Sequence, residues 1–147
     1  MPTEPAYLAG NAKSLDNFRS LLSRLSDADL QRDLGEGWTV TAMLGHLAFY
    51  DFRIAALAAH WRQAGAVTPS PLDADILNVA LLPVWLAVPP RRAVELALQA
   101  AEAANAVVAG LDAATLSQLN AIGNPLKLDR AEHRQEHIEQ IERAIAG

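Results

Sequence analysis

Apolar side chains recur every three to four residues along four long stretches of the chain, the spacing that places them on one face of an α-helix. These stretches cover residues 7–25, 40–63, 91–110 and 129–146. In the first stretch, Leu15, Phe18 and Leu22 share one face. Long alternating apolar and polar runs, which would indicate strands, are missing. The pattern therefore predicts an all-α protein built as a four-helix bundle, with a broken crossover segment before the third helix.

Capping residues and helix breakers mark the ends of these helices. Thr39 is placed as the N-cap of the second helix and Gly65 ends it, while Asp129 is placed as the N-cap of the last. Ser26 and Asp29 have the spacing of a capping box, which predicts one further short turn. The stretch from Gly35 to Gly37 then breaks the chain.

The two longer connections have their own signals. In the crossover, Ser70-Pro71 suits an N-cap and first helical position, and residues 73–82 follow a helical pattern that Pro83 must end or kink. The second connection, up to Pro125, is predicted to be a loop with one turn at residues 113–119. No internal repeat or low-complexity tract is visible, so residues 1–147 are predicted to form a single domain.

Composition supports the helical prediction and excludes several classes of partner. Hydrophobic residues make up 51% of the chain and aromatic residues only 5%, which favours helices over sheets. The net charge of −5 and the lack of a dense basic patch argue against nucleic acid as a partner. No apolar stretch reaches the roughly 18 residues of a membrane span, and the N-terminal residues do not resemble a secretory signal. A cytoplasmic protein is the simplest expectation.

The chain has no cysteine, which limits the chemistry that it can perform alone. Disulfides and thiolate metal ligands are excluded. Any thiol chemistry would therefore need a thiol supplied from outside the protein.

Two histidines in the last helix have metal-ligand spacing. His133 and His137 are four residues apart and lie one turn above each other, as in the HExxH helix of zinc enzymes. The glutamate of that motif is absent, because the sequence is His-Arg-Gln-Glu-His. On spacing alone, a solvated pair at the edge of the apolar face is the more common interpretation. A third ligand from elsewhere in the chain would favour a metal.

His46 is the natural third ligand. The segment Trp38-Thr-Val-Thr-Ala-Met-Leu-Gly-His46 is similar to the second-helix signature of the DinB-like superfamily, and His133-xxx-His137 is similar to the other half of its metal site. The segments from His46 to Arg53 and from Asp75 to Asn78 also resemble the branch near the mycothiol-dependent maleylpyruvate isomerases. The resemblance covers nearly the whole chain, but its specific part is the three histidines and the tryptophan.

The resemblance implies an up-up-down-down four-helix bundle in which His46, His133 and His137 bind a divalent metal, most often zinc or nickel. It also implies a homodimer and, in some relatives, the use of a low-molecular-weight thiol. Three neutral imidazoles leave coordination positions open, as in catalytic zinc sites, and a metal there lowers the pKa of a bound thiol or water. Histidines alone do not select among zinc, nickel, copper and iron(II).

These observations lead to three hypotheses about function. The first is an enzyme that uses a metal-activated external thiol, or water, for transfer or isomerisation of a small molecule. The second is a non-catalytic dimeric module that binds a metal or a small ligand. The third is a vestigial site that stays empty.

Four further residues are candidates for substrate binding: Tyr50, Arg53, Asn78 and Arg130. Tyr50 and Arg53 follow His46 by one and two turns and could hold a substrate carboxylate, although a packed tyrosine and a snorkelling arginine are the more common interpretation. Asn78 either reaches into the site or caps the broken helix, and Arg130 is either a second-shell charge or a solvated helix start. Specificity is expected from the loops around these residues and from the turn at 123–125.

The remaining candidates have structural interpretations. His60 lies about 21 Å along the helix from His46, at 1.5 Å per residue, so it cannot share the metal and is expected at the surface or a dimer edge. Arg134 is expected to pair with a carboxylate at an interface. The three tryptophans, Trp38, Trp61 and Trp85, are expected to pack in the core or at its rim.

Overall fold

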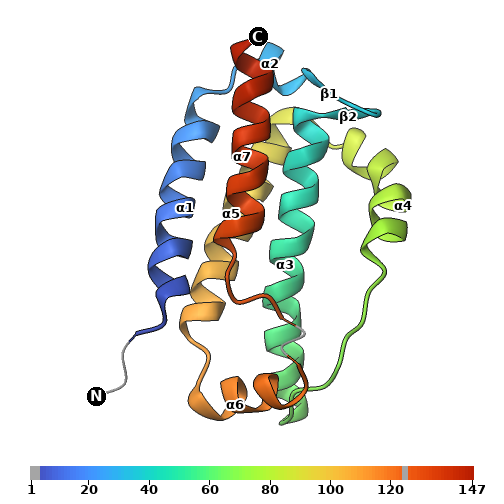
Figure 1. The fold of residues 1–147 in the computed structure, drawn as a ribbon. Helices are drawn as coiled ribbons and strands as arrows, with labels where there is room; N and C mark the ends of the chain where they lie inside the picture. The colour runs from blue at the N-terminus through green and yellow to red at the C-terminus, as the bar shows by residue number, and fades with distance from the viewer. Residues whose placement is uncertain (1–3, 124–125) are drawn as a thin grey trace.

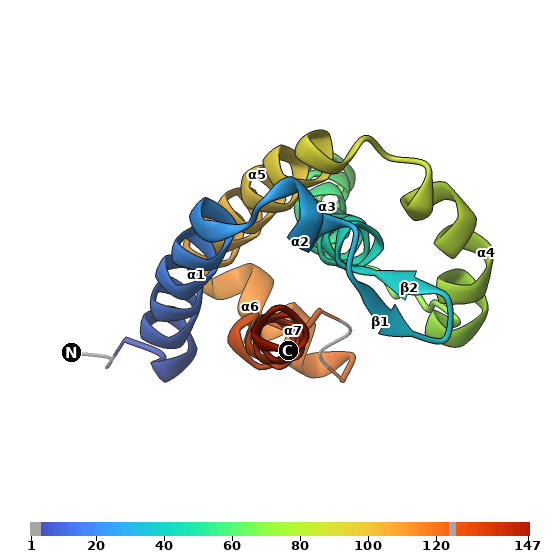
Figure 2. The same cartoon turned by 90° about the horizontal axis from the view of Figure 1, so that it is seen from above.

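The computed structural model describes residues 4–123 and 126–147, and these are mostly helical (Figure 1). The described elements, in chain order, are α1 (Ala6–Arg24), α2 (Asp27–Leu30), β1 (Asp33–Gly35), β2 (Trp38–Thr39), α3 (Val40–Ala64), α4 (Ala74–Leu86), α5 (Pro90–Ala109), α6 (Ala113–Ala121) and α7 (Ala131–Ala146). The predicted all-α class is confirmed, apart from one small antiparallel sheet that the sequence pattern did not predict. Four of the helices, α1, α3, α5 and α7, are long and lie side by side (Figures 1 and 2).

The directions of these helices follow from the residues that meet between them. Asn17 meets Gln135 and Arg24 meets Glu142, so α1 and α7 run in parallel. Asn11 meets Asn105 while Asp27, at the other end, meets Arg91, so α1 and α5 run in opposite directions. Figure 1 shows the same arrangement, with α1 and α7 rising and α3 and α5 descending.

The chain order is therefore up, down, down, up, which differs from the expected up-up-down-down order. The reason lies in the two connections. The segment between α1 and α3 stays at one end of the molecule and reverses the chain there. The crossover before α5 instead returns along the whole length of α3, so that α5 starts at the same end as α3 and runs parallel to it.

Alanines supply most of the core face of α5, whereas the larger core side chains come from the other long helices. The buried alanines of α5 are Ala93, Ala97, Ala100, Ala101 and Ala104. Opposite them lie Phe18 and Leu21 of α1, Leu44 of α3 and Ile138 of α7, each at most 1% exposed. A small-residue face on one helix leaves room for large side chains from its neighbours, as close packing of the interior requires. The interior is thus specified by apolar periodicity, as the sequence pattern predicts.

The connection from α1 to α3 places the first part of the site. The predicted capping box is present, with the hydroxyl of Ser26 accepting from the backbone of Asp29 at 3.0 Å. The predicted break at Gly35-Glu-Gly37 is a hairpin turn. Glu36 and Gly37 have φ values of 54° and 86°, the positive values that a type I′ turn requires at both central positions. The hairpin delivers Trp38 directly to the start of α3, which Thr39 caps as predicted.

The start of α4 differs from the prediction at Ser70-Pro71. Asp73 is the N-cap, because its carboxylate accepts the backbone N–H of Ile76 at 3.3 Å. Pro83 does not end the helix, which continues to Leu86. The carbonyl that loses its partner to Pro83 belongs to Val79, which is 75% exposed, so water can bond to it.

The second connection contains more structure than the predicted single turn. Residues of α6 form a nine-residue helix. Asp112 caps it by accepting the N–H of Thr115 at 2.7 Å, and Leu119 is completely buried. Of the predicted specificity turn at 123–125, residues 124 and 125 lie outside the described part of the chain.

The last helix begins two residues later than its predicted N-cap. The Asp129 carboxylate accepts the N–H of Ala131 at 2.9 Å, and Arg130 occupies the position between them with φ −89° and ψ −11°. Within the described residues, no single helix has the length and hydropathy to cross a bilayer; α5 and α6 meet that test only as a pair, which is bent by 96°.

Candidate metal centre

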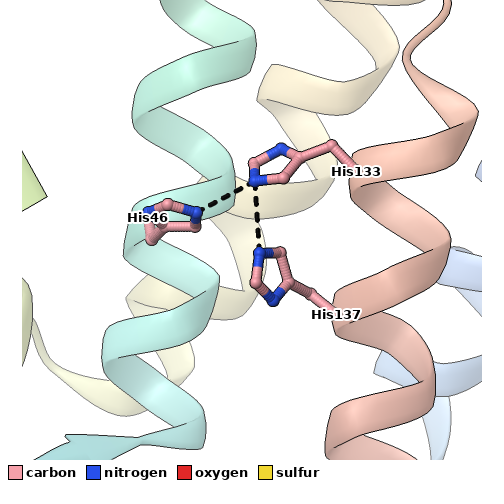
Figure 3. Close-up of side chains that lie close together, drawn as sticks. All are labelled: His46, His133 and His137. Carbon is pink, nitrogen blue, oxygen red and sulfur yellow. Dashed lines mark hydrogen bonds between the residues drawn. The ribbon is translucent and has the colours of Figure 1, made fainter. Parts of the chain in front are cut away.

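Three histidines from two antiparallel helices converge at one point. His46 lies in the second turn of α3, and His133 and His137 lie in the first two turns of α7. Their Nε2 atoms point toward one another (Figure 3). The Nε2 of His133 is 3.0 Å from that of His46 and 3.2 Å from that of His137. One nitrogen from each ring lies within 4.8 Å of the other two, which is the arrangement of a metal-binding group.

These separations fit a single tetrahedral ion. Zinc–nitrogen bonds of about 2.0–2.1 Å place two ligand nitrogens about 3.3–3.4 Å apart at the tetrahedral angle. The two separations in the structure, 3.0 and 3.2 Å, are only slightly shorter. Within the described part of the chain, the group consists of three imidazoles with no fourth protein ligand, and a set of three histidines is also that of open zinc sites.

Hydrogen bonds alone do not explain the convergence. A neutral imidazole Nε2 carries either one hydrogen or one lone pair, both in the plane of the ring. The Nε2 of His133 faces two other ring nitrogens, so it can satisfy only one of these contacts well. A cation between the three rings would satisfy all three lone pairs. The donor set therefore fits a metal ion.

Burial keeps two of the three rings in the neutral form that binds metals. It lowers the pKa of His46 from 6.5 to about 4, with His137 adding to this effect and the amide of nearby Asn78 opposing it. It lowers the pKa of His133 from 6.5 to about 3, with the neighbouring histidines, Arg130 and Lys127 contributing in the same direction. Both rings are therefore neutral at pH 7, and no proton has to leave them before a metal binds.

Aromatic rings enclose His46. Trp38 and Trp85 approach it edge-on, with ring centroids 5.5 and 5.4 Å away, and Tyr50 lies at 4.9 Å. Trp85 fits there because residue 45 is glycine: a Cβ at this position would lie 2.8 Å from the Cδ1 of Trp85. The expected packing role of the tryptophans is confirmed: Trp61 and Trp85 are buried, and Trp38 is half-buried and packs against the core. Sequence analysis missed that two of them shield the site.

The Nδ1 atoms of His46 and His137 differ in their hydrogen bonding. His137 Nδ1 lies 2.9 Å from Oε1 of Gln140, a contact that fixes its ring. His46 Nδ1 is buried and has no hydrogen-bond partner. Metal-binding histidines usually donate this second N–H to a partner, which raises their basicity. His46 thus departs from that pattern.

The residues predicted to bind substrate gather at a cavity of about 390 Å³ beside the histidines. Tyr50, Arg53, Asn78 and Arg130 line it together with His46 and His133. The hydroxyl of Tyr50 donates to Oδ1 of Asn78 at 2.9 Å, and Arg53 donates to the carbonyl of Ser70 at 2.7 Å. Asn78 therefore faces the site and does not cap α4. The role of these residues in binding stays a prediction.

A buried ion cluster supports the first turn of α7. Asp51 of α3 accepts from Arg130 at 3.0 Å and from Arg134 at 3.4 Å. Arg134 also donates to Ser14 and Asn105, so the cluster ties all four long helices together. Arg134 pairs with a carboxylate as predicted, but inside the core. Sequence analysis missed Asp51, although an acidic residue among the buried positions of an apolar helix was a usable signal.

His60, by contrast, is exposed near the end of α3, away from the metal centre, as predicted. A cavity of about 300 Å³ between α3 and α6 lies at this end of the molecule and contains none of the histidines. The candidate metal-binding and substrate-binding side chains therefore lie at or next to the cavity of about 390 Å³ beside the histidines.

The chain matches no family model, no curated protein and no solved structure. The resemblance to the DinB-like superfamily therefore rests on Trp38 and the three histidines, and on their order and spacing.

Proposed function

We propose that the protein is a metal-dependent enzyme of the DinB-like type, in which His46, His133 and His137 hold one divalent ion, zinc or nickel. The observation that carries the proposal is the convergence of three Nε2 atoms at separations suited to one ion. A bound ion there supplies Lewis acidity that lowers the pKa of a thiol or a water molecule. Because the chain has no cysteine, the thiol would be an external small molecule.

The surroundings of the histidines support a catalytic site over a closed structural one. Among the described residues, three protein ligands converge, and a cavity borders them, so a substrate has access. Trp38 and Trp85 pack edge-on against the ring of His46. Burial raises the pKa of Tyr50, which keeps its hydroxyl protonated and able to donate a hydrogen bond.

The substrate is a small molecule held at the cavity by Tyr50, Arg53, Asn78 and Arg130. Arg53 and Arg130 would bring positive charge to the cavity beside the histidines, and Tyr50 and Asn78 would contribute one hydroxyl and one amide. The proposed reaction is transfer or isomerisation with the thiol as nucleophile, or hydrolysis when water takes its place.

A homodimer of this helical bundle, acting in the cytoplasm, completes the proposal. Sedimentation of the purified protein tests the dimer: it predicts twice the 15.8 kDa mass of one chain. A single species at 15.8 kDa over micromolar concentrations would contradict it.

One observation favours a second candidate function, a non-catalytic module that binds a metal or a small ligand. The Nδ1 of His46 is buried without a partner. A ligand histidine without this support is less basic and holds a metal less tightly. Such a site would suit reversible binding better than a permanently loaded catalytic centre.

Metal content tests the proposed site. Protein purified without a histidine tag should carry close to one metal ion per chain, and His137→Ala should lose it. His60→Ala is the matched control, because His60 is exposed on α3 away from the site, and it should keep the metal. Protein that takes up no metal even after reconstitution would overturn the proposal and favour a vestigial site.

Turnover separates the enzyme from the binding module. The metal-loaded protein is incubated with low-molecular-weight thiols and small electrophiles, before and after removal of the metal by a chelator. The enzyme predicts product formation that stops on chelation and returns on reloading. Saturable binding without any product would support the module.

A further inference from the structure

The cavity of about 300 Å³ between α3 and α6, which we name the α6 cavity, lies at the end of the molecule opposite the hairpin. Its walls come from the last turns of α3, the turn that follows, the end of α5 and the first turns of α6. Figure 1 shows that α3 and α5 end near the same level and that α6 runs across below them. The α6 cavity shares no lining residue with the cavity beside the histidines, so it is a separate space.

Hydrogen bonds hold the walls of the α6 cavity in place. The backbone N–H of Val67 donates to Oε1 of Gln118 at 3.0 Å, which joins the turn after α3 to α6. The indole N–H of Trp61 donates to the carbonyl of Thr68 at 3.1 Å, which joins the same turn to α3. Trp61 and Leu119 are buried together in one core cluster beneath these contacts. The cavity is therefore formed before any ligand enters, as most small-molecule sites are.

One cation and one anion line the α6 cavity. They are Arg62, in the last turn of α3, and Asp112, the N-cap of α6. Hydrogen bonds from the backbone and the side chain of Thr115 lower the pKa of Asp112, and the positive charge of Arg62 adds to this effect, so the two charges lie near each other. Among the described residues, however, Arg62 belongs to no ion pair. Both charges thus remain open to a ligand.

The backbone and one amide side chain add to these two charges. Gly65 and Gly110, which terminate α3 and α5, both line the cavity. The last carbonyl groups of a helix have no partner within it, and they carry the negative end of its dipole, equivalent to about half an elementary charge. Two such ends beside Asp112 favour an ammonium group. The Gln118 amide, whose Oε1 is bonded to Val67, has an NH₂ group to offer a carboxylate together with Arg62.

The rest of the lining is apolar and sets the size of the ligand. Ala58 and Trp61 are buried, and Val67 and Leu111 are half-buried. A volume of about 300 Å³ corresponds to about ten water molecules at about 30 Å³ each. This space accommodates one small molecule with a short hydrocarbon chain, but not an oligopeptide or a nucleotide.

We propose that the α6 cavity binds a free amino acid with an aliphatic side chain. Its ammonium group would lie against Asp112 and the ends of α3 and α5, its carboxylate against Arg62 and Gln118, and its hydrocarbon chain against Trp61. An α-amino acid carries both charges on one carbon atom, so it can bridge an acid and a base that do not pair directly. A ligand with a single charge would leave one of the two residues unmatched. This site lies apart from the metal centre and does not depend on the proposed function.

Three probes that share one hydrocarbon chain separate the contributions of the two charges. L-leucine carries both charges, 3-methylbutylamine lacks the carboxylate, and 4-methylpentanoate lacks the ammonium group. Titrations followed by nitrogen–proton NMR correlation spectra report on the indole N–H of each tryptophan. Trp61→Phe identifies the signal of Trp61, which lines the cavity, whereas Trp38 and Trp85 lie beside His46 and serve as internal references.

Two variants remove one charge each from the α6 cavity. They are Arg62→Gln and Asp112→Asn, and the second keeps α6 capped because asparagine is also a good N-cap. Asp73→Asn is the matched control for the second, since it changes the N-cap of α4 in the same way. Arg143→Gln is the control for the first, because Arg143 is an exposed arginine in the last turn of α7.

Leucine should shift the Trp61 signal and leave those of Trp38 and Trp85 in place. It should bind at least about threefold more tightly than either probe with a single charge, the modest factor expected of exposed charges. Arg62→Gln should abolish its advantage over 3-methylbutylamine, and Asp112→Asn its advantage over 4-methylpentanoate. The two control variants should bind all three probes as the unchanged protein does.

Equal binding of the three probes would overturn the assignment of an amino acid, as would an affinity for leucine that neither variant changes. A Trp61 signal that leucine does not move even at its solubility limit would show that the cavity holds only water. These outcomes are independent of metal binding, which the metal content of His137→Ala tests.

Discussion

The Nε2 atom of His133 gives the clearest indication that the site binds a metal ion. The Nε2 of His133 faces both other histidines at hydrogen-bond distance but has only one hydrogen or one lone pair to offer. The spacing of His133 and His137 was visible in the sequence, and so was His46 as a third ligand. Their approach to within 4.8 Å was not, because it depends on how α3 and α7 pack.

The lowered pKa values of His46 and His133 predict that the metal-free protein loses stability in mild acid. In the unfolded chain these rings take up protons near pH 6.5, but in the folded protein only near pH 4 and pH 3. Between these values the unfolded state binds more protons, so the free energy of unfolding falls as the pH falls from 6.5 toward 4.

Thermal unfolding between pH 7 and pH 5 in the presence of a chelator measures this loss. His133→Asn, which cannot take up the proton, should lose less stability than the unchanged protein over the same interval. His60→Asn should behave as the unchanged protein, because His60 is exposed. Equal losses in His133→Asn and the unchanged protein would contradict the assignment of buried neutral rings.

At the scale of single elements, capping residues predicted the ends of a helix correctly where only one candidate cap was present. Thr39 and Gly65 bound α3 in the structure as they do in the sequence. The start of α4 was misplaced because two caps compete: Ser70-Pro71 has the right local pattern, but Asp73 makes the hydrogen bond. The full length of α6 was missed because the helix is short and its apolar periodicity is weak. Burial of Leu119 against the rest of the molecule stabilises this helix.

The contact between α3 and α4 depends on the missing side chain at Gly45. An added Cβ would lie within 2.8–3.1 Å of three atoms of Trp85. Gly45→Ala should therefore push Trp85 from His46 and destabilise the protein by about 1–3 kcal/mol through overpacking, reduced by up to about 1 kcal/mol through better helix propensity.

Gly10→Ala is the matched control, because its Cβ would meet only Ala131 at 3.8 Å, an ordinary contact. It should be neutral or more stable than the unchanged protein. Urea unfolding followed by tryptophan fluorescence compares the two variants. Equal stabilities would show that Trp85 is not held against α3 as the structure has it.

At the scale of the whole molecule, the polar cluster of Asp51, Arg130 and Arg134 joins the four long helices at the level of the metal centre. Apolar periodicity predicted that these helices exist. It could not predict their order of directions, because each pattern fixes only which face is buried and not which neighbour covers it. The cluster adds ion pairs and hydrogen bonds that join all four helices in the observed arrangement.

Asp51→Asn should therefore cost far more than the loss of a surface ion pair. It keeps the size of the side chain but leaves two buried guanidinium groups without a carboxylate, which costs about 3–5 kcal/mol. Asp16→Asn removes the exposed pair with Arg19 and should cost less than about 1 kcal/mol. Chemical unfolding measures both, and a cost for Asp51→Asn as small as that for Asp16→Asn would show that the cluster does not hold the helices together.

The central claim is that three imidazoles from two distant segments hold a single ion. Crystals of zinc-loaded protein, measured on both sides of the zinc absorption edge, locate that ion directly. The account predicts one anomalous peak about 2.0–2.1 Å from the Nε2 atoms of His46, His133 and His137. Zinc bound elsewhere, or bound by His133 and His137 without His46, would contradict it.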